Sequence, residues 1–485
     1  MFIGIDLGTS SLKASAVLHN GEIVAACSES YELLTPQEGW CEQNPADWAS
    51  AMFLSIKKLG EKVDLSKVQG ISFSGQMHGL VCLDENNKVI RPAILWNDQR
   101  TALETDYLNE SVGLSKLVQW TGNRAVTGFT APKVLWMKNN EPENFAKIRK
   151  IMLPKDYLAF LLSGVFATDV SDASGTLFFD VKNRCWSKPM LELLSIQESM
   201  LPTVYESSQA IGSVALEVAQ TTGLSITAKV VIGGGDQAVG AIGTGTVAEG
   251  NISVSLGTSG VVFASCDSFY NEEEGLLHNF CHANNKYHYM GVTLAAGASR
   301  SWIAETLSID DFGAIDKKIK ELGIDSLIYT PYLTGERSPI FAPQVKGGLF
   351  GLTLQTTPAH IMKAVMEGVA FSLRDCLQVM RDVGVKIDKA RCIGGGSKSD
   401  VWMQILADVL QVPICRINTA DGGALGAAIL AMVGTGLYAS VEDACSKLIK
   451  DEKTFYPNAD NVKRYNEKFA QYKDFQQYSL RSASV

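Results

Sequence analysis

The chain has no excess of positive charge. Its 485 residues include 43 Lys and Arg against 52 Asp and Glu, so the net charge is −9. Nucleic acids and anionic membrane surfaces attract proteins through a basic field. This charge balance therefore excludes both as main partners, while it leaves room for a local basic site that binds one small anion.

Paired cysteines and long apolar runs are also missing. The ten cysteines are scattered and no Cys-x-x-Cys pair occurs, which argues against a zinc site and a disulfide framework. No apolar run reaches the roughly 18 residues that a membrane span requires. The sequence starts directly with a strand-like segment where a signal peptide would have its basic and apolar regions. These absences predict a cytoplasmic protein with reduced cysteines.

The length and two internal repeats predict two similar domains. A chain of 485 residues is too long for one ordinary core, and 46% hydrophobic with 20% charged residues is a globular composition. The tetrad Leu-Gly-Thr-Ser occurs at 7–10 and at 256–259, each time between two strand-like segments. A strand ending in three glycines and followed by a helix occurs at 233–235 and at 394–396. We therefore expect two α/β domains that face each other, residues 1–245 and 246–485.

The repeated Leu-Gly-Thr-Ser turn predicts a phosphate site. In such a turn, backbone N–H groups converge on an anion and the hydroxyls add donors. A single copy would read as a plain hairpin turn, but two copies on facing domains could hold a polyphosphate from both sides. Neither a GxxxxGK[ST] loop nor a GxGxxG fingerprint occurs, so the sequence does not support a Walker or dinucleotide site.

Only the first copy of the turn is charged. Asp6 precedes it and could hold Mg²⁺, which keeps most of its water shell and needs only one or two carboxylates. The alternative is an Asp that merely stabilises the turn. Lys13 lies just beyond the turn, either as a point charge on the phosphates or as a solvated strand residue. In the second copy, Ser255 stands where the first has Asp6.

The glycine runs differ in the same way. Asp236 follows the first run, at the end of a strand where open α/β sheets place ligand-binding groups. It could be an N-cap of the next helix, or a base that accepts a proton from a hydroxyl attacking phosphorus. The second run continues with Ser397. With both acids in one half, we expect the first half to bind the polar substrate and carry the chemistry, and the second to hold the nucleotide.

Other polar segments are less decisive. His78 lies in a turn between two strands, where a lone His is usually structural. The segments 95–100 and 332–339 place charged residues in short loops that could be ordinary surface turns. The tail after about residue 455 is polar, aromatic and helix-like, and we expect it to pack on the surface.

Together these motifs resemble the FGGY carbohydrate kinases, which belong to the actin-like, ribonuclease-H-like ATPase superfamily. Segments 128–140 and 347–368 look like the two family signatures, and the resemblance runs over essentially the whole chain. "SGQMHG", "RPAILWNDQR", "LPKDYL", "DASGT" and "PYLTGERSP" are most similar to the members that phosphorylate D-xylulose. Glycerol kinases carry Arg-Glu where this chain has Met77 and His78, so the resemblance argues against glycerol.

The resemblance implies an activity and a set of site residues. The expected reaction is ATP-dependent phosphorylation of D-xylulose to D-xylulose 5-phosphate, with Mg²⁺ as cofactor. Asp236 would accept the proton of the sugar 5-hydroxyl, and Asp6 would organise the metal. The sugar would contact Met77, His78, Asp236 and Gln237, the last standing where some members have Asn. The nucleotide would contact Thr9, Ser10, Ser11, Lys13, Gly257, Thr258, Ser259, Gly297, Gly395, Gly396 and Ser399.

Two further expectations come from the family. Small residues at 422–429 resemble a second connection between the domains, where helices slide as the cleft closes. A homodimer is expected at the family level only. The alternatives are a kinase for another pentulose or polyol, such as ribulose, and a non-catalytic actin-like ATPase that is indifferent to sugars.

Overall fold

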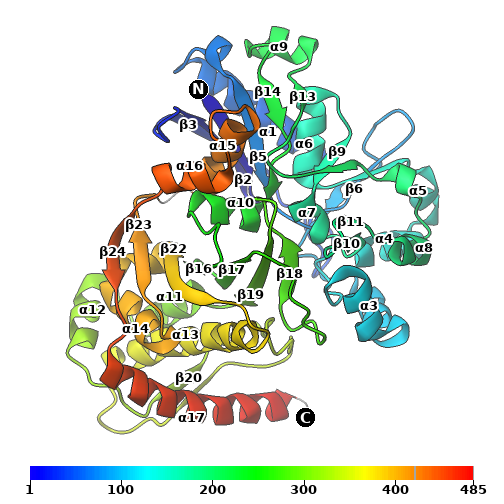
Figure 1. Ribbon diagram of the computed structural model, residues 1–485. Coiled ribbons are helices and arrows are strands. Elements are labelled where there is room, and N and C mark those ends of the chain that lie inside the picture. The colour runs from blue at the N-terminus through cyan, green and yellow to red at the C-terminus, as the bar shows by residue number, and fades with distance from the viewer. Residues whose placement is uncertain (420–421, 484–485) are drawn as a thin grey trace.

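Two seven-stranded sheets lie one in each half of the chain in the computed structural model, which describes residues 1–419 and 422–483 (Figure 1). The first sheet has the order β13-β14-β5-β1-β2-β3, with β15 paired to β5. Its strands are β1 (Phe2–Leu7), β2 (Ser11–Val17), β3 (Ile23–Ser30), β5 (Gly70–Gly75), β13 (Ala210–Ser213), β14 (Lys229–Val231) and β15 (Gly234–Gly235). The second has the order β18-β19-β17-β16-β22-β23-β24. Its strands are β16 (Gly250–Leu256), β17 (Gly260–Cys266), β18 (His278–Cys281), β19 (Tyr287–Thr293), β22 (Ile387–Ile393), β23 (Ile414–Ile417) and β24 (Asp451–Phe455).

The two sheets repeat the same plan. Strand β1 pairs antiparallel with β2 and parallel with β5, and β16 pairs antiparallel with β17 and parallel with β22. The two Leu-Gly-Thr-Ser turns join β1 to β2 and β16 to β17, and the glycine runs fall at β15 and directly after β22. The predicted duplication of an α/β unit is therefore confirmed. Strand β18 is an addition at the edge of the second sheet.

Asp6 stands out from its strand because β1 is otherwise apolar and buried. The burial of β1 comes from helices on both faces of the sheet, since α1 (Pro45–Gly60) packs on β2 and β3 while α15 (Gly422–Gly434) packs on β1 and β5. Only Asp6 in this strand is half-buried. It lies near the carboxyl end of the strand, which is the edge where open α/β sheets bind ligands.

Helix α15 comes from the second half of the sequence but lies on the first sheet (Figure 1). A Cβ atom at Gly4 of β1 would be 1.9 Å from the carbonyl oxygen of Ala424, so only glycine allows this approach. Helix α10 (Asp236–Gly243) lies beside α15, and a Cβ at Gly426 would be 2.0 Å from the carbonyl oxygen of Val239. The small residues predicted at this connection thus let three backbones meet closely.

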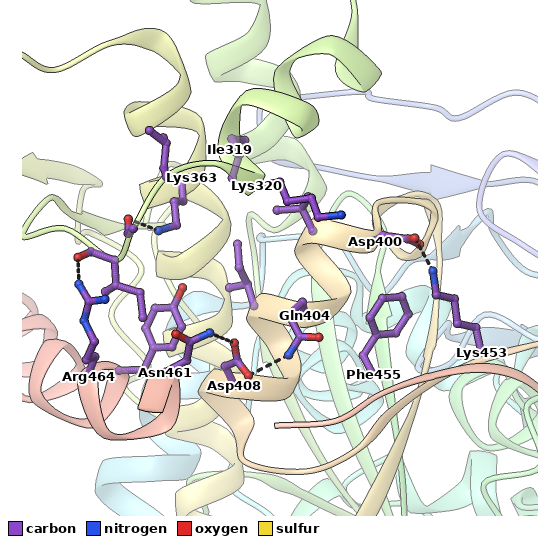
Figure 2. Close-up of a pocket in the computed structure, with 16 residues that line it drawn as sticks. Ile319, Lys320, Lys363, Asp400, Gln404, Asp408, Lys453, Phe455, Asn461 and Arg464 are labelled. Carbon is purple, nitrogen blue, oxygen red and sulfur yellow. Dashed lines mark hydrogen bonds and ion pairs between the residues drawn. The ribbon is translucent and has the colours of Figure 1, made fainter. Parts of the chain in front are cut away.

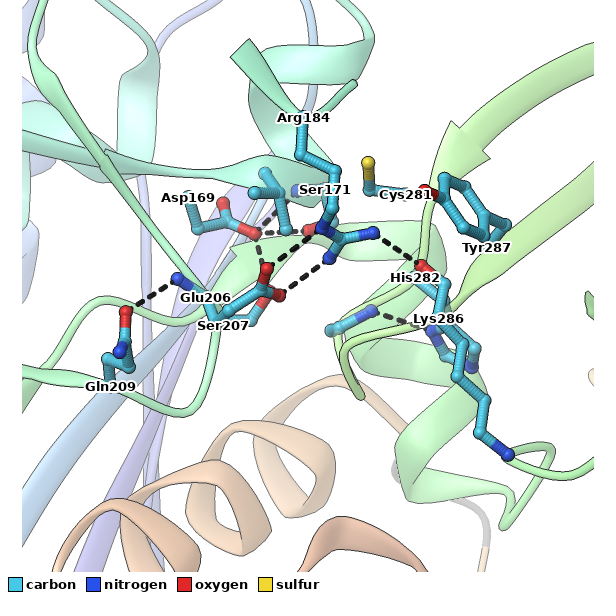
Figure 3. A network of polar contacts seen from close by, with 12 residues as sticks. Asp169, Ser171, Arg184, Glu206, Ser207, Gln209, Cys281, His282, Lys286 and Tyr287 are labelled. Carbon is cyan, nitrogen blue, oxygen red and sulfur yellow. Dashed lines mark hydrogen bonds and ion pairs between the residues drawn. The ribbon is translucent and has the colours of Figure 1, made fainter. Parts of the chain in front are cut away.

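The halves also meet where β18 and β19 reach the first half (Figure 3). The Arg184 guanidinium forms a bidentate ion pair with Glu206, with N···O distances of 2.9 and 2.6 Å, and donates to the carbonyl oxygen of Lys286 at 3.0 Å. The backbone N–H of Cys281 donates to the Ser174 hydroxyl at 3.0 Å. These bonds fix the edge of the second sheet against the first half.

The C-terminal tail forms a helix with one buried face. Helix α17 (Ala459–Ala483) buries Tyr465 and Tyr472, which are 2% and 0% exposed, in the core of the second half. The hydroxyls of Tyr472 and Tyr332 are hydrogen-bonded at 2.7 Å. The tail is thus a helix that packs on the outside of the second half, as expected, and its aromatic residues recur at helical spacing to form the one face that joins the core.

The structure also shows the state of the cysteines and the character of the longest helices. All ten cysteines are free, and Cys185 is the exposed one among them. Within residues 1–419 and 422–483, no helix is both long and apolar enough to cross a membrane.

Candidate active site

The first Leu-Gly-Thr-Ser turn, which we call the first phosphate turn after its predicted role, lies between β1 and β2 and is held by side chains from other loops. The backbone N–H of Gly8 donates to the carbonyl of Ser11 at 3.0 Å and closes the turn. The Thr9 hydroxyl accepts from the Trp96 indole at 2.9 Å, and the Thr9 carbonyl accepts from Gln43 at 2.6 Å. The turn therefore has a fixed shape. The structure brings together the residues predicted here, which are Asp6, Thr9, Ser10, Ser11 and Lys13.

The second phosphate turn packs directly on a helix N-terminus. The N–H of Gly297, the first residue of α11 (Gly297–Thr306), donates to the Gly257 carbonyl at 2.8 Å. A Cβ at Gly297 would lie 2.4 Å from that oxygen, so the approach requires glycine. Thr258 is exposed at the tip, with Ser259 half-buried beside it. This places backbone N–H groups of α11 next to the turn, an arrangement suited to anions.

The second glycine run lies beside the same turn. Gly394 has a φ of 86°, and a Cβ there would be 2.6 Å from the carbonyl oxygen of Leu256. Gly396 is packed on the Leu256 side chain, whereas Gly395 is exposed, and a Cβ there would meet no atom within 4 Å. Ser399 is 5% exposed and its hydroxyl accepts from the N–H of Trp402 at 3.2 Å, as the N-cap of α14 (Asp400–Leu410). Its contact with nucleotide stays a prediction.

Asp236 is the first residue of α10, directly after Gly235 at the N-cap. Its carboxyl group is half-buried. Burial first, and then the negative charge of Asp6, raise the pKa of Asp236 from 3.8 to about 7. The Gln237 amide lies 3.4 Å from one carboxyl oxygen. A carboxyl group with a pKa near neutrality is suited to accept a proton from a hydroxyl.

Met77 and His78 lie against the turn that carries Asp236. A Cβ at Gly235 would be 2.8 Å from the Met77 sulfur, and a Cβ at Gly175 would be 2.5 Å from the His78 ring and 2.9 Å from the methyl group of Met77. Three turns, at 76–79, 175–176 and 234–236, therefore converge. The predicted sugar residues Met77, His78, Asp236 and Gln237 come together at this point.

The His78 side chain is fixed on all sides. The residue has a φ of 69°, its Nδ1 is 2.7 Å from the Gly175 carbonyl, and its ring stacks on Phe129 with centroids 4.6 Å apart. The buried Lys133 ammonium donates to the His78 carbonyl at 2.8 Å and holds this left-handed backbone. Burial lowers the pKa of His78 to about 3, so the ring is neutral and its other nitrogen can bond to a ligand.

A buried charge cluster lies beside the turns that carry the residues predicted to bind the sugar. Lys155 lies 2.5 Å from Asp156, 2.9 Å from Asp169 and 3.6 Å from Asp172, all four side chains being fully buried. These carboxylates raise the pKa of Lys155 although burial opposes them, and burial raises the pKa of Asp172 well above its usual value, with Asp236 adding to it. Within the described residues neither oxygen of Asp172 has a hydrogen-bond partner.

Sequence reasoning noted these segments only as similar motifs. The one signal was the spacing of Asp169 and Asp172, three residues apart in a segment rich in small residues. The sequence of loop 95–100 is also compatible with an ordinary surface turn, but Asp98 is fully buried and forms a bidentate bond with Arg100. Trp96 of that loop is 37% exposed beside the first phosphate turn.

The residues present fit a magnesium ion that arrives with the nucleotide. No three His, Cys, Asp or Glu side chains gather as metal ligands in the parts of the chain that the structure describes. Mg²⁺ does not need such a cage, because water and phosphate oxygens complete its octahedron. Asp6 lies beside the first phosphate turn and repels the Asp236 carboxylate, a repulsion that a cation would relieve.

A cavity of about 360 Å³ lies elsewhere, between α14, α17 and α12 (Phe312–Lys320) (Figure 2). Its polar groups bond to one another: Gln404 with Asp408 at 2.9 Å and Lys363 with the Gly323 carbonyl at 2.6 Å. Trp402, which packs toward the second phosphate turn, lies on the opposite face of α14 from Gln404. None of the predicted site residues lines this cavity, so it is separate from the site.

Comparisons with known proteins agree with this geometry. The xylulose kinase of Bacillus subtilis (strain 168) is 40% identical over 481 residues, which cover 97% of this chain and 96% of that protein. A solved structure described as a xyloylose kinase from Brucella ovis has a TM-score of 0.93 at 36% identity and covers 98% of both chains. A gluconate kinase from Lactobacillus acidophilus has a TM-score of 0.95 at 26% identity and covers 100% of this chain and 99% of that one.

The family is shown by its two domains. Residues 1–243 match the N-terminal domain of the FGGY family of carbohydrate kinases, and residues 252–435 match its C-terminal domain. The predicted fold of two α/β domains is confirmed by a solved kinase of the same architecture. From its paired domains and its doubled turns, the chain belongs to the FGGY family of carbohydrate kinases.

Proposed function

We propose that the chain phosphorylates D-xylulose to D-xylulose 5-phosphate with ATP as the donor. One observation carries this proposal: the Asp236 carboxyl, whose pKa is raised to about 7, directly follows Gly235, which packs on Met77 next to His78. A base thus lies next to a neutral histidine whose free ring nitrogen can bond to a hydroxyl of a small polyhydroxyl substrate. The names of relatives at about 40% identity favour xylulose among such substrates.

In this mechanism the sugar lies in the first half, with its 5-hydroxyl against Asp236. The ionised carboxylate accepts the hydroxyl proton as the oxygen attacks the γ-phosphorus of ATP. The nucleotide lies between the two phosphate turns, with Thr9, Ser10, Ser11 and Lys13 on one side. On the other side are Gly257, Thr258, Ser259 and Gly297, followed by Gly395, Gly396 and Ser399. Most of the rate enhancement then comes from positioning and from donors aimed at the phosphates.

Magnesium is part of the proposal. Asp6 would hold Mg²⁺ through water, and the ion would neutralise charge on the phosphates during transfer. The two halves, which we place at 1–245 and 246–485, would close over the sugar and expel water. Small residues at the α10–α15 contact favour such sliding because few side chains interlock there.

A coupled assay of ADP release tests the proposal. We expect the largest kcat/KM with D-xylulose in a panel that also holds D-ribulose, glycerol and D-gluconate, and no turnover without Mg²⁺. A higher kcat/KM with D-ribulose or another polyol would assign the chain to a different substrate of the same family. ADP release that is indifferent to every sugar would overturn the kinase proposal in favour of a plain ATPase.

A further inference from the structure

Strand β18 belongs to the second sheet, but it carries a histidine to the sugar side of the first half. The strand is fixed there by Asn123, whose amide donates to the Asn279 carbonyl at 2.8 Å and whose oxygen accepts from the Asn279 N–H at 2.9 Å. At the other end, Cys281 is bonded to Ser174. His278, next to Asn279, is therefore held in place by hydrogen bonds to the first half.

The His278 ring joins an aromatic group that includes His78. Its centroid is 5.5 Å from that of Phe129 and 5.6 Å from that of Phe280, and Phe129 in turn stacks on His78. His278 is only 3% exposed, and its ring nitrogens form no hydrogen bond in the part of the chain that the structure describes. Burial, aided by the charge of Arg337, lowers its pKa well below the usual value. The ring is thus a neutral donor and acceptor that lacks a partner.

Arg337 lies near the same two histidines. The N–H of Ser338, the next residue, donates to the Val292 carbonyl at 3.0 Å, and Val292 is two residues from Met290, which pairs with His278. In agreement with this position, the positive charge of Arg337 lowers the pKa of both His78 and His278. The side chain is half-buried, yet across residues 1–419 and 422–483 its guanidinium makes no hydrogen bond and no ion pair. A guanidinium that is partly removed from water without a partner is costly, and it binds oxygen atoms strongly.

The backbone of Arg337 is nevertheless rigid. The buried carboxyl of Glu336 accepts from the Arg337 N–H at 2.8 Å, from the Leu294 N–H at 2.9 Å and from the Thr293 hydroxyl at 2.6 Å. The loop is therefore fixed to strand β19 of the second sheet. A rigid backbone that presents an unpaired guanidinium is what a ligand contact requires.

The contacts also give an order of residues that starts at Asp236. Asp236 follows Gly235, Gly235 packs on Met77, and Met77 precedes His78. His78 stacks on Phe129, and Phe129 in turn lies against His278, so His278 is the last residue in this series of contacts that begins at Asp236. A ketose with its 5-hydroxyl at Asp236 would therefore direct its C1 hydroxyl and C2 carbonyl toward His278 and Arg337.

We propose that His278 and Arg337, both from the second half, bind the C1 hydroxyl and C2 carbonyl of the sugar and determine its specificity. This inference rests on the proposed ketose kinase function. In this arrangement the C1 and C2 end of the sugar binds to the second half of the chain, which is also the half proposed to bind the nucleotide. Sugar binding then draws the two halves together through direct contacts, before any contribution from ATP.

The test compares D-xylulose with 1-deoxy-D-xylulose, which lacks only the C1 hydroxyl. A site that hydrogen-bonds a substrate hydroxyl rejects the analogue without it, by about 10⁴-fold in strong cases. We expect Arg337→Met and His278→Phe to raise KM for D-xylulose by roughly 10- to 100-fold, because each removes about 1–3 kcal/mol of hydrogen bonding. The kcat should change little, since neither residue touches the reacting atoms. Discrimination between the two sugars should shrink by a similar factor.

Arg464→Met serves as the control, because Arg464 bonds to the Ile324 carbonyl beside the separate cavity of Figure 2. This variant should keep the wild-type ratio of the two sugars. If Arg337→Met does not fold, as judged by thermal melting, Arg337→Lys keeps the charge and should still lose part of the discrimination. An unchanged ratio in folded Arg337 and His278 variants would overturn the inference, whereas absence of ketopentose turnover in the wild type would overturn the proposed function itself.

Discussion

Asp6 and Asp236 act on each other across the carboxyl edge of the first sheet, and the charge of Asp6 helps to raise the pKa of Asp236. The two residues come from positions 230 apart in the sequence, where one precedes a hydroxyl-rich turn and the other begins a helix. Two neighbouring carboxyl groups with different surroundings can take different roles, one holding a metal and the other accepting a proton.

Asp236→Asn should remove the base while it keeps the shape of the site. We expect kcat to fall by about 10²- to 10⁴-fold, which is the usual contribution of a general base. ATP affinity, measured by titration calorimetry, should stay within twofold because the nucleotide turns are intact. The exposed Asp460→Asn at the start of α17 is the matched control and should keep full activity. Near-normal turnover of Asp236→Asn would exclude Asp236 as the base.

The same substitution should stabilise the protein at alkaline pH. The folded state raises the pKa of Asp236 from 3.8 to about 7, so ionisation of this group opposes folding. The neutral Asp236 carboxyl makes its full contribution to the free energy of unfolding below pH 3.8. This contribution is lost as pH rises through 7, and the loss is roughly 4 kcal/mol at most. We therefore expect the Tm of Asp236→Asn to exceed that of the wild type at pH 8, and the gap to close toward pH 4. A gap that is constant with pH would contradict the raised pKa.

Lys155→Met should destabilise the first half. It leaves Asp156 and Asp169 buried without their cation, and breaking a buried ion pair in this way costs about 3–5 kcal/mol. Urea unfolding measures the loss. Lys447→Met removes an exposed i,i+4 pair with Asp443 and should cost about 0.5 kcal/mol or less. Equal effects of the two substitutions would show that the buried cluster contributes no more than a surface pair.

Gly423→Ala should displace Asp6. A Cβ at this position would lie 2.4 Å from the Asp6 carboxylate, so the side chain must move away from the phosphate turn. We expect kcat to fall by about 10²-fold, as for an error of about 1 Å in catalytic geometry, together with a higher Mg²⁺ requirement. Gly240→Ala in the neighbouring α10 meets no atom within 4 Å and should be active. If both variants bind and use Mg²⁺ as the wild type does, Asp6 is not the metal residue.

The sequence predicted the features that are local. The doubled turns, the strands before them, the glycine runs and the helix from about Ser399 all depend on short stretches of chain, and the structure has them in place. The charge cluster of Lys155, the strand that carries His278 and the loop of Arg337 depend on contacts between distant residues. No periodicity in the sequence reports such contacts. The regular spacing of the aromatic residues in α17 does indicate a buried apolar face, but the overall composition of the segment is polar and does not predict how deeply that face is buried.

The position of α15 has a consequence for how the protein is made. The helix that covers β1 and β5 is translated more than 400 residues after β1, so the first sheet remains open on one face until synthesis is almost complete. A fragment ending near residue 245 would expose that apolar face and aggregate. Co-expression with residues 246–485 would supply the missing helix in trans. The two halves are therefore suited to a split-protein assay in which reassembly restores sugar-dependent ADP release.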